Sequence, residues 1–343
     1  MPVKVPPSGP IPARIMIVGE APGVDEELRL EPFVGVSGKE LDKMLAEAGL
    51  SRGECFVTNV ARERPYNNDI NNFIAKAKNV VTPLHRPMRD KMVLPPMLEG
   101  WALLQKEIEL VKPTCIIALG NTPLWALTGH WGITKWRGST LHYNASWPCC
   151  VIPTYHPAAI LRQWEWRSIA VNDLRRAKRV RDQGVPFKPA WRFIIRPSFN
   201  EAVNTLGGLI IKLNSAPLRL SFDIETRNGH IACAGISWSR LDAICIPLME
   251  AGQPKGYWDL EQETQLTWLL YKILTHPNAR VIGQNIIYDS QYTYRHWHFV
   301  PRVFQDTMIA QHALFSALPK GLAFLASMYC SYYSFWKEEG KRI

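Results

Sequence analysis

Two carboxylates stand in one short apolar stretch of the chain, RLSFDIET at residues 219–226. Side chains of a β-strand alternate between its two faces, so Asp223 and Glu225 point to one face. Phe222 and Ile224 point to the other face and can be buried. Two like charges side by side repel each other unless a cation lies between them. The pattern therefore indicates either a solvated strand face or a site for a divalent metal ion.

Three other polar residues follow buried segments in the first half of the chain. Glu20 comes directly after RIMIVG, Asn59 lies near the end of CFVTNV, and His156 follows CCVIPTY. These apolar segments alternate with helical patterns, which predicts a parallel or mostly parallel sheet. Ligands of such sheets bind at the carboxyl ends of the strands, so we expect these three side chains to converge.

The composition bounds the class of protein. With 343 residues, 47% of them hydrophobic, the chain is long enough for two domains with cores. Its net charge of +10 favours a nucleic-acid partner. Seven cysteines without regular spacing argue against a disulfide framework and for a reducing compartment. Because no segment has the pattern of a signal peptide or a membrane span, we expect a soluble intracellular protein.

A Pro-rich junction, GVPFKPAW at residues 184–191, separates two α/β patterns. Before the junction, short buried strands alternate with helices. After it, four strand patterns come first and helices follow, which predicts a second α/β domain. We therefore expect domains at residues 1–185 and 186–343.

Five short motifs of the first domain, in this order, resemble those of the family 4 uracil-DNA glycosylases. They are GEAPG at 19–23, PFVGVSG at 32–38, TNVARERP at 58–65, ALG at 118–120 and TYHPAAILR at 154–162. The resemblance covers roughly residues 12–180. It implies an α/β/α sandwich with a mainly parallel sheet. It also implies hydrolysis of the N-glycosidic bond of uracil in DNA, without a cofactor.

The resemblance implies roles for four side chains. Phe33 would stack on a flipped uracil, and the Asn59 amide would bind the edge of the base. His156 would donate a hydrogen bond to the leaving base, while Glu20 would orient a water molecule or stabilise the cationic sugar. Taken singly, each type has a structural alternative: Asn59 as a turn residue, His156 as a loop residue and Phe33 as a core residue.

Further substrate contacts are implied around these side chains. The backbone from Ala21 to Gly23 would help to cradle the base. Leu161 would be the wedge that enters the duplex as the base leaves, and Arg162 would contact a phosphate.

The sequence departs from this family at the positions that usually hold an iron–sulfur cluster on four cysteines. No cysteine precedes Arg14, and none lies between Cys55 and Cys115. Glu63 stands at one ligand position, within RERP. We therefore expect no iron–sulfur cluster.

Two further expectations follow from these departures. Without a cluster, the irregular segment 61–94 would be held by the packing of Phe73, Ile74, Val80 and Leu84. Leu30 stands where the family usually has Gly, which leaves the shape of the pocket and the base specificity open.

The second domain resembles the proofreading 3′–5′ exonuclease domain of family A DNA polymerases over about residues 190–343. DIET at 223–226 matches the first motif, and NIIYD at 285–289 supplies the Asn and Asp of the second. DTMIAQHALFSALPKGLAFLASMY at 306–329 resembles the helices that follow. The resemblance implies a ribonuclease H-like α/β fold.

In this chemistry carboxylates bind Mg²⁺ or Mn²⁺. By resemblance the ligands would be Asp223, Glu225 and Asp289, whereas Asp306 would begin a helix. The family completes the site with Tyr-x-x-x-Asp on a later helix, but the acids after Asp306 are Glu338 and Glu339 alone. We therefore expect either an impaired exonuclease or the N-terminal part of a longer viral replicative polymerase, and we favour the second. A polymerase domain would then follow.

The leading hypothesis is thus a uracil-DNA glycosylase joined to an incomplete exonuclease. It would act as a monomer on single- or double-stranded DNA that contains uracil, in the cytoplasm of a bacterial host if the chain is viral. One alternative is a module that reads uracil or another modified base, or tethers DNA, without cutting it. Another is an exonuclease with an N-terminal domain that only holds DNA.

Overall fold

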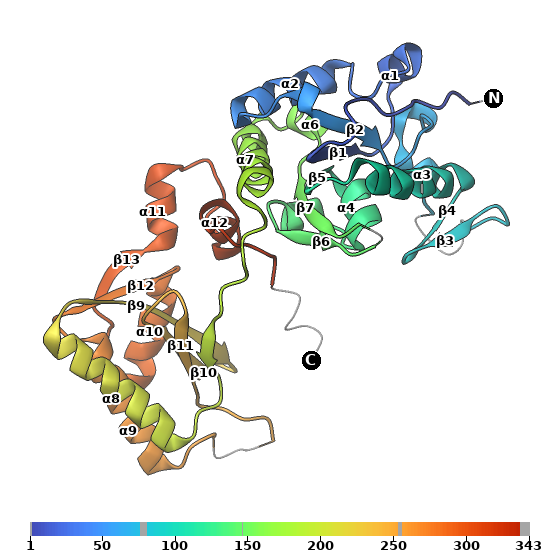
Figure 1. Ribbon diagram of the computed structural model, residues 1–343. Coiled ribbons are helices and arrows are strands. Elements are labelled where there is room, and N and C mark those ends of the chain that lie inside the picture. Colours follow the sequence, from blue (N-terminus) through green and yellow to red (C-terminus); the bar gives the residue numbers. More distant parts are fainter. Residues whose placement is uncertain (1, 76–80, 146, 253–255, 337–343) are drawn as a thin grey trace. The chain divides into compact units, whose positions relative to one another are not determined.

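The computed structural model describes residues 2–75, 81–145, 147–252 and 256–336 (Figure 1). The chain divides into two compact units. Unit 1 holds the residues up to Phe187 together with those from Ala326 onward, and unit 2 holds Lys188–Leu325. The expected boundary after residue 185 lies close to the first division. The expectation that the second domain includes everything after it differs from the structure, because residues 326–336 pack in unit 1.

Unit 1 contains a mainly parallel sheet, as the alternation of strands and helices predicted. Within the described residues the strands lie in the order β2-β1-β5-β7-β6, and only β6 runs antiparallel to its neighbour. They are β1 (Ile15–Gly19), β2 (Cys55–Asn59), β5 (Cys115–Leu119), β6 (Leu141–Tyr143) and β7 (Cys149–Thr154). Because β1 is flanked by β2 on one side and β5 on the other, a topological switch point lies at its carboxyl end.

Helices pack on this sheet, which explains why its strands are apolar at successive positions. The longer helices are α2 (Val36–Ala48), α3 (Pro95–Val111), α4 (Asn121–Thr128) and α7 (Arg167–Gln183). The short ones are α1 (Val24–Arg29), η1 (Arg52–Glu54), η2 (Tyr66–Asn68), η3 (Ile70–Asn72), α5 (Ile133–Trp136), α6 (Pro157–Ile160) and η5 (Trp164–Trp166). Helices α2 and α7 contact each other, and α7 contacts β5 and β7.

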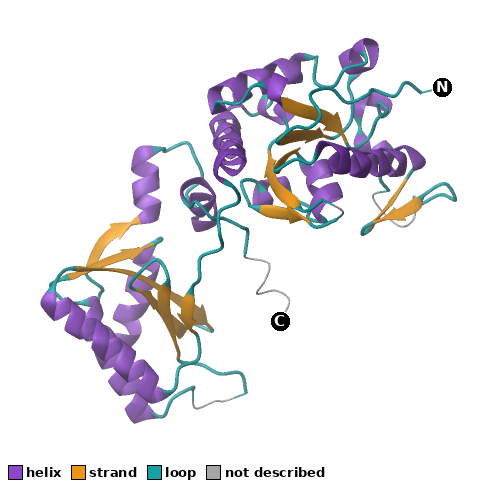
Figure 2. Cartoon of the chain, in the orientation of Figure 1, coloured by secondary structure: helices purple, strands orange, loops and turns teal. Residues whose placement is uncertain are grey.

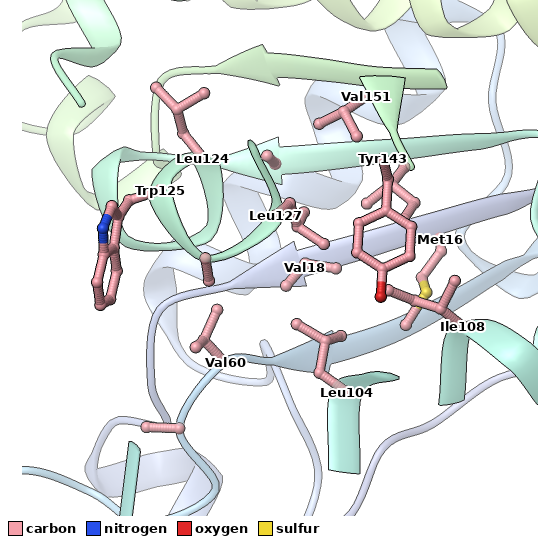
Figure 3. Packing of buried hydrophobic residues seen from close by; sticks show 14 of the residues in the cluster. Met16, Val18, Val60, Leu104, Ile108, Leu124, Trp125, Leu127, Tyr143 and Val151 are labelled. Atoms are coloured by element: carbon pink, nitrogen blue, oxygen red, sulfur yellow. The ribbon is translucent and has the colours of Figure 1, made fainter. Parts of the chain in front are cut away.

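Helices α3 and α4 close a hydrophobic core over one face of the sheet (Figure 3). Met16 and Val18 of β1 contribute to it together with Leu104 of α3 and Leu124 of α4. Met16 and Val18 are two positions apart, so they point to the same face of β1. The helix residues that cover this face recur with the helical period, as expected for helices packed on a sheet.

The segment between β2 and α3 is held differently from the prediction. Ile74 is buried and Phe73 packs against the core as expected, but Leu84 is 66% exposed, and Val80 lies outside the described residues. The segment contains the hairpin of β3 (Arg86–Met88) and β4 (Lys91–Val93). At its turn, Asp90 accepts a hydrogen bond of 2.6 Å from the Trp125 indole, so polar contacts to α4 replace the expected apolar one.

Unit 2 has a mixed sheet with the strand order β13-β12-β9-β10-β11-β8 in the described residues. The strands are β8 (Arg192–Ile194), β9 (Leu218–Arg227), β10 (His230–Ser237), β11 (Asp242–Pro247), β12 (Ala279–Gly283) and β13 (Val303–Asp306). The helices are α8 (Phe199–Ser215), α9 (Leu260–Leu274), α10 (Ile286–Trp297), α11 (Thr307–Leu314) and α12 (Leu322–Tyr329), whose residues from Ala326 belong to unit 1. Figure 2 draws the helices in purple and the strands in orange. Among the described helices, we find none with the length and apolar character needed to cross a bilayer.

Strand β9 alternates as its sequence predicted. Its even-numbered residues from Leu220 to Ile224 are buried in a core with α8 and α9. Its odd-numbered residues from Ser221 to Glu225 are exposed on the opposite face. The two carboxylates of DIET therefore lie on the face away from the core.

Candidate active sites

A pocket of about 630 Å³ opens at the carboxyl ends of the strands of unit 1, and we call it the strand-end pocket. Glu20, Asn59 and His156 all line it, so the predicted convergence is confirmed. Phe33 lines it as well. Residues that are distant in sequence meet here because parallel strands end at one edge of the sheet.

Gly19, the last residue of β1, allows two of these side chains to approach the strand. A Cβ atom at Gly19 would overlap the Phe33 ring and the Asn59 carbonyl oxygen. Phe33 has a left-handed φ of 56°, and Arg52 donates a hydrogen bond of 3.1 Å to its carbonyl oxygen. The ring centroids of Phe33 and His156 are 5.7 Å apart. Phe33 is thus fixed by the backbone, by Arg52 and by the absence of a side chain at Gly19.

Glu26 organises the loops around the pocket, and the sequence analysis missed it. Its Oε2 accepts a hydrogen bond from the Gly23 N–H at 3.0 Å. Its Oε1 accepts from Val34 and Gly35 at 3.0 and 2.9 Å. Gly23 lines the pocket as predicted, but its N–H is already bound within the protein. A Glu three residues after a helix N-cap is the capping-box spacing, which could have identified Glu26.

Thr122, at the start of α4, donates a hydrogen bond to Oε2 of Glu20. Burial raises the pKa of Glu20 above its ordinary value, the Thr122 hydrogen bond opposes this rise, and the charge of Asp69 adds to it. The hydrogen bond therefore favours the carboxylate form of Glu20 in a partly dry site. Nothing in the sequence distinguished Thr122 from an ordinary helix residue.

His156 is a neutral hydrogen-bond donor in this pocket. It is the N-cap of α6, and its Nδ1 accepts a hydrogen bond of 3.2 Å from the Ala158 N–H, which places the ring proton on Nε2. Burial lowers the pKa of His156 to about 4, and the positive charge of Arg162 acts in the same direction. The imidazole is therefore uncharged at neutral pH.

Asn59 is 4% exposed, and its side-chain oxygen is buried without a hydrogen-bond partner among the described residues. Buried polar atoms in folded proteins are nearly always paired, and an unpaired one costs free energy. Because Asn59 lines the pocket, this oxygen is available to a donor of a bound molecule.

Of the further residues predicted to contact the substrate, some line the pocket and one does not. Ala21 and Arg162 line the pocket, whereas Leu161 lies outside the lining and is 43% exposed. Trp166 stacks on Tyr155 with a centroid distance of 4.4 Å and forms part of the wall. Leu161 is thus exposed between lining residues Ala159 and Arg162, and its role as a wedge stays a prediction.

Helix α7 offers fewer free cations than its basic sequence suggests. Arg176 is 1% exposed, so it cannot contact a phosphate. Arg167 binds Glu40 at 2.7 Å, and Arg181 binds Glu54 at 3.1 Å. Much of the positive charge of α7 is thus buried or paired with carboxylates within the protein.

Leu30 does not alter the pocket. It caps the C-terminus of α1 with a left-handed φ of 55°, is 52% exposed and is not a lining residue. Glycine is the residue best suited to such a cap, because it adopts a positive φ without steric strain.

Glu63, which the resemblance placed at a position expected for a cluster ligand, takes part in an ion-pair group. Lys4 Nζ lies 3.9 Å from a Glu63 carboxylate oxygen and 2.7 Å from one of Glu99. The N-terminal strand segment and α3 are therefore connected by these charges.

The predicted metal ligands of unit 2 lie on β9 and α10, where β12 and β9 stop pairing. The two strands pair only as far as Ser221, which leaves the N–H of Ile224 without a strand partner on that side. Asp289 of α10 accepts a hydrogen bond from this N–H at 2.8 Å and is 2% exposed. We call Asp223, Glu225 and Asp289 the acidic trio.

The acidic trio is electrostatically strained. Burial raises the pKa of Asp289 to about 6, and the charge of Asp223 adds to this effect. Burial also raises the pKa of Asp223, with a further contribution from Glu225. In the described part of the chain, no group of three or more His, Cys, Asp or Glu residues is arranged closely enough to hold a metal ion. The three carboxylates would have to move closer together to share a cation.

Asp306 has the structural role that the sequence predicted for it. It is the N-cap of α11, where its Oδ1 accepts a hydrogen bond of 2.8 Å from the Met308 N–H. Its Oδ2 accepts another of 2.9 Å from the Ile286 N–H at the start of α10. Asp306 therefore fixes two helix starts, whereas Glu338 and Glu339 lie outside the described residues.

Comparison with known proteins agrees with both assignments. The profile of the uracil DNA glycosylase superfamily matches residues 6–175, and that of a 3′–5′ exonuclease matches residues 203–342. The type-4 uracil-DNA glycosylase of Saccharolobus solfataricus is 34% identical over 181 residues, covering 51% of this chain and 74% of that protein.

Two further similarities each cover a little under half of the chain. The DNA polymerase of Bacillus phage SP01 is 30% identical over 164 residues, which is 47% of this chain and 15% of that polymerase. The crystal structure of Escherichia coli RNase D matches 45% of this chain and 36% of that one, with 15% identity and a TM-score of 0.29. The chain thus belongs to the uracil DNA glycosylase superfamily through its N-terminal half and carries a 3′–5′ exonuclease domain in its C-terminal half.

Proposed function

We propose that unit 1 hydrolyses the N-glycosidic bond of uracil in DNA. The observation that carries this proposal is the buried, unpaired oxygen of Asn59, which lies in a pocket beside the Phe33 ring and a neutral His156. Uracil offers a flat ring for stacking, an N–H donor for Asn59 and a carbonyl oxygen for His156. The type-4 glycosylases to which the chain is similar support this substrate.

Each side chain then has one task in the reaction. The base leaves the stack and enters the pocket, where Phe33 stacks on it and Asn59 binds its edge. As the bond to the sugar breaks, negative charge develops on the base, and the Nε2–H of His156 donates a hydrogen bond to it. The Glu20 carboxylate, held by Thr122, stabilises the cationic sugar and orients the attacking water.

DNA is the partner that these roles require. Leu161 would fill the space that the flipped nucleotide leaves, and Arg162 would bind an adjacent phosphate. The net charge of +10 supports an acidic partner. A strong requirement for Leu161 would indicate a double-stranded substrate, since only a duplex leaves a gap to be filled.

We further propose that the acidic trio binds Mg²⁺ or Mn²⁺ and supports 3′–5′ hydrolysis of DNA. Carboxylate oxygens are the ligands these cations prefer, and a cation would offset the burial and the like charge that raise the pKa of Asp223 and Asp289. When bound, such ions stabilise the charge that develops during phosphodiester cleavage. Asp223 and Glu225 contribute by facing the open side of the sheet, and Asp289 contributes by fixing the edge of β9.

The two activities fit the N-terminal part of a viral replicative polymerase, and the similarity to a phage DNA polymerase supports this assignment. In such a polymerase, unit 1 would act on uracil in the DNA to which the polymerase is bound. A polymerase domain would follow the exonuclease domain. The alternative, in which unit 1 reads uracil without cutting it, predicts binding without release of the base.

The test of the glycosylase is release of uracil from a labelled oligonucleotide in the presence of EDTA. We expect release by the wild-type chain and roughly 10²-fold slower release by His156→Ala. Tight binding of uracil-containing DNA without release would favour the alternative. Absence of both would refute the assignment of the pocket.

The test of the exonuclease compares this chain with one extended through a Tyr-x-x-x-Asp helix, at equal Mg²⁺. We expect slow digestion by the 343-residue chain, fast digestion by the longer one, and none by the longer one with Asp223→Ala. Full digestion by the 343-residue chain would show that its site is already complete.

A further inference from the structure

Residues 326–336 return to unit 1 after the chain has passed through unit 2, and we call them the return segment. They include the C-terminal half of α12 and the extended residues after it. The exonuclease profile covers these residues, yet their contacts lie on the glycosylase unit. Three sets of contacts connect the return segment to the rest of unit 1.

The first set of contacts surrounds Arg176 of α7. This residue is 1% exposed, and its guanidinium donates hydrogen bonds of 2.7 to 2.9 Å to three backbone carbonyls, those of Ser327, Cys330 and Ser331. The last carbonyls of a helix have no hydrogen-bond partner within the helix. A buried guanidinium at this end therefore satisfies these carbonyls and its own N–H groups. Without the return segment, Arg176 would lose these three hydrogen bonds.

The second set connects the return segment to the strand that carries His156. Arg137 is 3% exposed and donates a hydrogen bond of 2.7 Å to the Ser327 hydroxyl and one of 2.8 Å to Oδ2 of Asp173. The same Oδ2 accepts a hydrogen bond of 2.9 Å from the Thr154 hydroxyl. Thr154 is the last residue of β7, two positions before His156.

The third set lies at the end of α5, whose Ile133 and Thr134 line the strand-end pocket. The Tyr333 carbonyl accepts a hydrogen bond of 2.7 Å from the Thr140 N–H. The Phe335 ring packs edge-on against Trp136 at a centroid distance of 5.4 Å. The return segment therefore holds the chain directly after this pocket wall.

We propose that the return segment is a positioning element of the glycosylase site, which fixes β7 at His156 through Ser327 and Arg137 and fixes the α5 wall through Tyr333 and Phe335. The inference rests on the proposed function for its catalytic readout. It goes further by assigning to the uracil site a segment that lies beyond unit 2 in the sequence. The full rate of excision by unit 1 then depends on residues that follow unit 2 in the sequence.

The experiment uses the full chain with Ser327→Ala, which removes the hydroxyl that binds Arg137. Ser331→Ala is the matched control, because Ser331 offers Arg176 its backbone carbonyl and has an exposed side chain. Both proteins are measured well below their unfolding temperatures. We expect Ser327→Ala to lower kcat for uracil release three- to tenfold with KM unchanged, and Ser331→Ala to stay within twofold of wild type.

Amide hydrogen exchange at residues 133–140 and 154–158 provides a readout that does not depend on activity. We expect faster exchange there in Ser327→Ala than in Ser331→Ala. Equal kcat and equal exchange in the two variants would overturn the proposal, and so would faster exchange with unchanged kcat. If wild type releases no uracil, the proposed function fails, and the exchange rates alone decide whether the return segment orders these residues. Should Ser327→Ala not fold, Phe335→Ala at the partly buried end of the segment replaces it.

Discussion

The strand-end pocket of unit 1 and the acidic trio of unit 2 differ in how complete they are before a ligand binds. In the pocket, Glu20 has Thr122, His156 has Ala158, and Asn59 alone keeps an unpaired oxygen. In the acidic trio, burial and a neighbouring carboxylate raise the pKa of Asp223 and of Asp289. The first site is ordered for an uncharged base, whereas the second needs a cation to relieve its own repulsion. Polar side chains at strand ends can thus form a preorganised site or a site that its ligand completes.

The largest effects should show that uracil release depends on the strand-end pocket and not on the acidic trio. His156→Ala or Glu20→Ala should slow uracil release by roughly 10²-fold or more, because each removes a contact to charge that develops in the transition state. EDTA and Asp223→Ala should leave release within twofold of wild type. The measurement is single-turnover release of labelled uracil. A requirement for metal in this assay would contradict the comparison.

Filling the space at Gly19 should disturb the pocket next most strongly. In Gly19→Ala the new methyl group would overlap the Phe33 ring and the Asn59 oxygen, so we expect a loss of at least tenfold in kcat/KM. Gly53→Ala is the matched control, since its nearest neighbour would be a serine hydroxyl oxygen at 3.7 Å. If both variants keep full activity, Phe33 is not positioned by Gly19.

The pH profile of uracil release should report Glu20 and not His156. Because burial raises the pKa of Glu20, the rate should fall as the pH drops toward that raised value. Thr122→Ala removes the hydrogen bond that lowers this pKa, so the acid limb should move to higher pH. Thr128→Ala, at the other end of α4, should leave the limb in place, because its hydroxyl bonds to the Leu124 carbonyl. With a pKa of about 4, His156 should add no transition near its ordinary value.

The acidic trio should make unit 2 less stable as the pH rises. The folded-state pKa of Asp289 is about 6, above its ordinary value, so its stabilising contribution is present at low pH and is lost as the pH rises through about 6. Calorimetry at pH 5 and pH 7.5 should therefore show a drop in Tm of a few degrees that Asp289→Asn reduces. Asp182→Asn, which removes an exposed carboxylate of unit 1, should leave the drop unchanged. Mg²⁺ should raise the Tm of wild type at pH 7.5, and an unchanged Tm would count against cation binding by the trio.

The smallest effect concerns Leu30, which lies outside both sites. Leu30→Gly should stabilise unit 1 by about 1 kcal/mol, because glycine adopts the left-handed cap without strain. Leu28→Gly, in the exposed interior of α1, should instead destabilise it by a similar amount. Denaturant unfolding measures both. A change in base specificity in Leu30→Gly would show that the cap does influence the pocket.

The parts of the structure that follow from local periodicity were predictable from the sequence. The alternation at Asp223 and Glu225 fixed their common face, and the strand ends brought Glu20, Asn59 and His156 together. These inferences need only the geometry of single strands and the parallel order of the sheet.

Contacts between residues far apart in sequence were not predictable in this way. Thr122 reaches Glu20 across 102 positions, and Arg137 reaches Ser327 across 190. A threonine or an arginine in a helical pattern gives no sign of such a partner. Arg176 illustrates this limit, because arginine is usually exposed and this one is buried in the structure.

Because unit 1 contains residues from before and after unit 2 in the sequence, its parts are synthesised at different times. Phe187 and Trp336 are 149 positions apart, so at about 5–20 residues per second a ribosome takes roughly 7–30 s to synthesise the chain between them. During that interval Arg137 and Arg176 of the nascent chain lack their partners in the return segment. The glycosylase half, although synthesised first, therefore matures last, and a chain interrupted within the exonuclease half would leave a glycosylase without the contacts that hold β7 and the α5 wall in place.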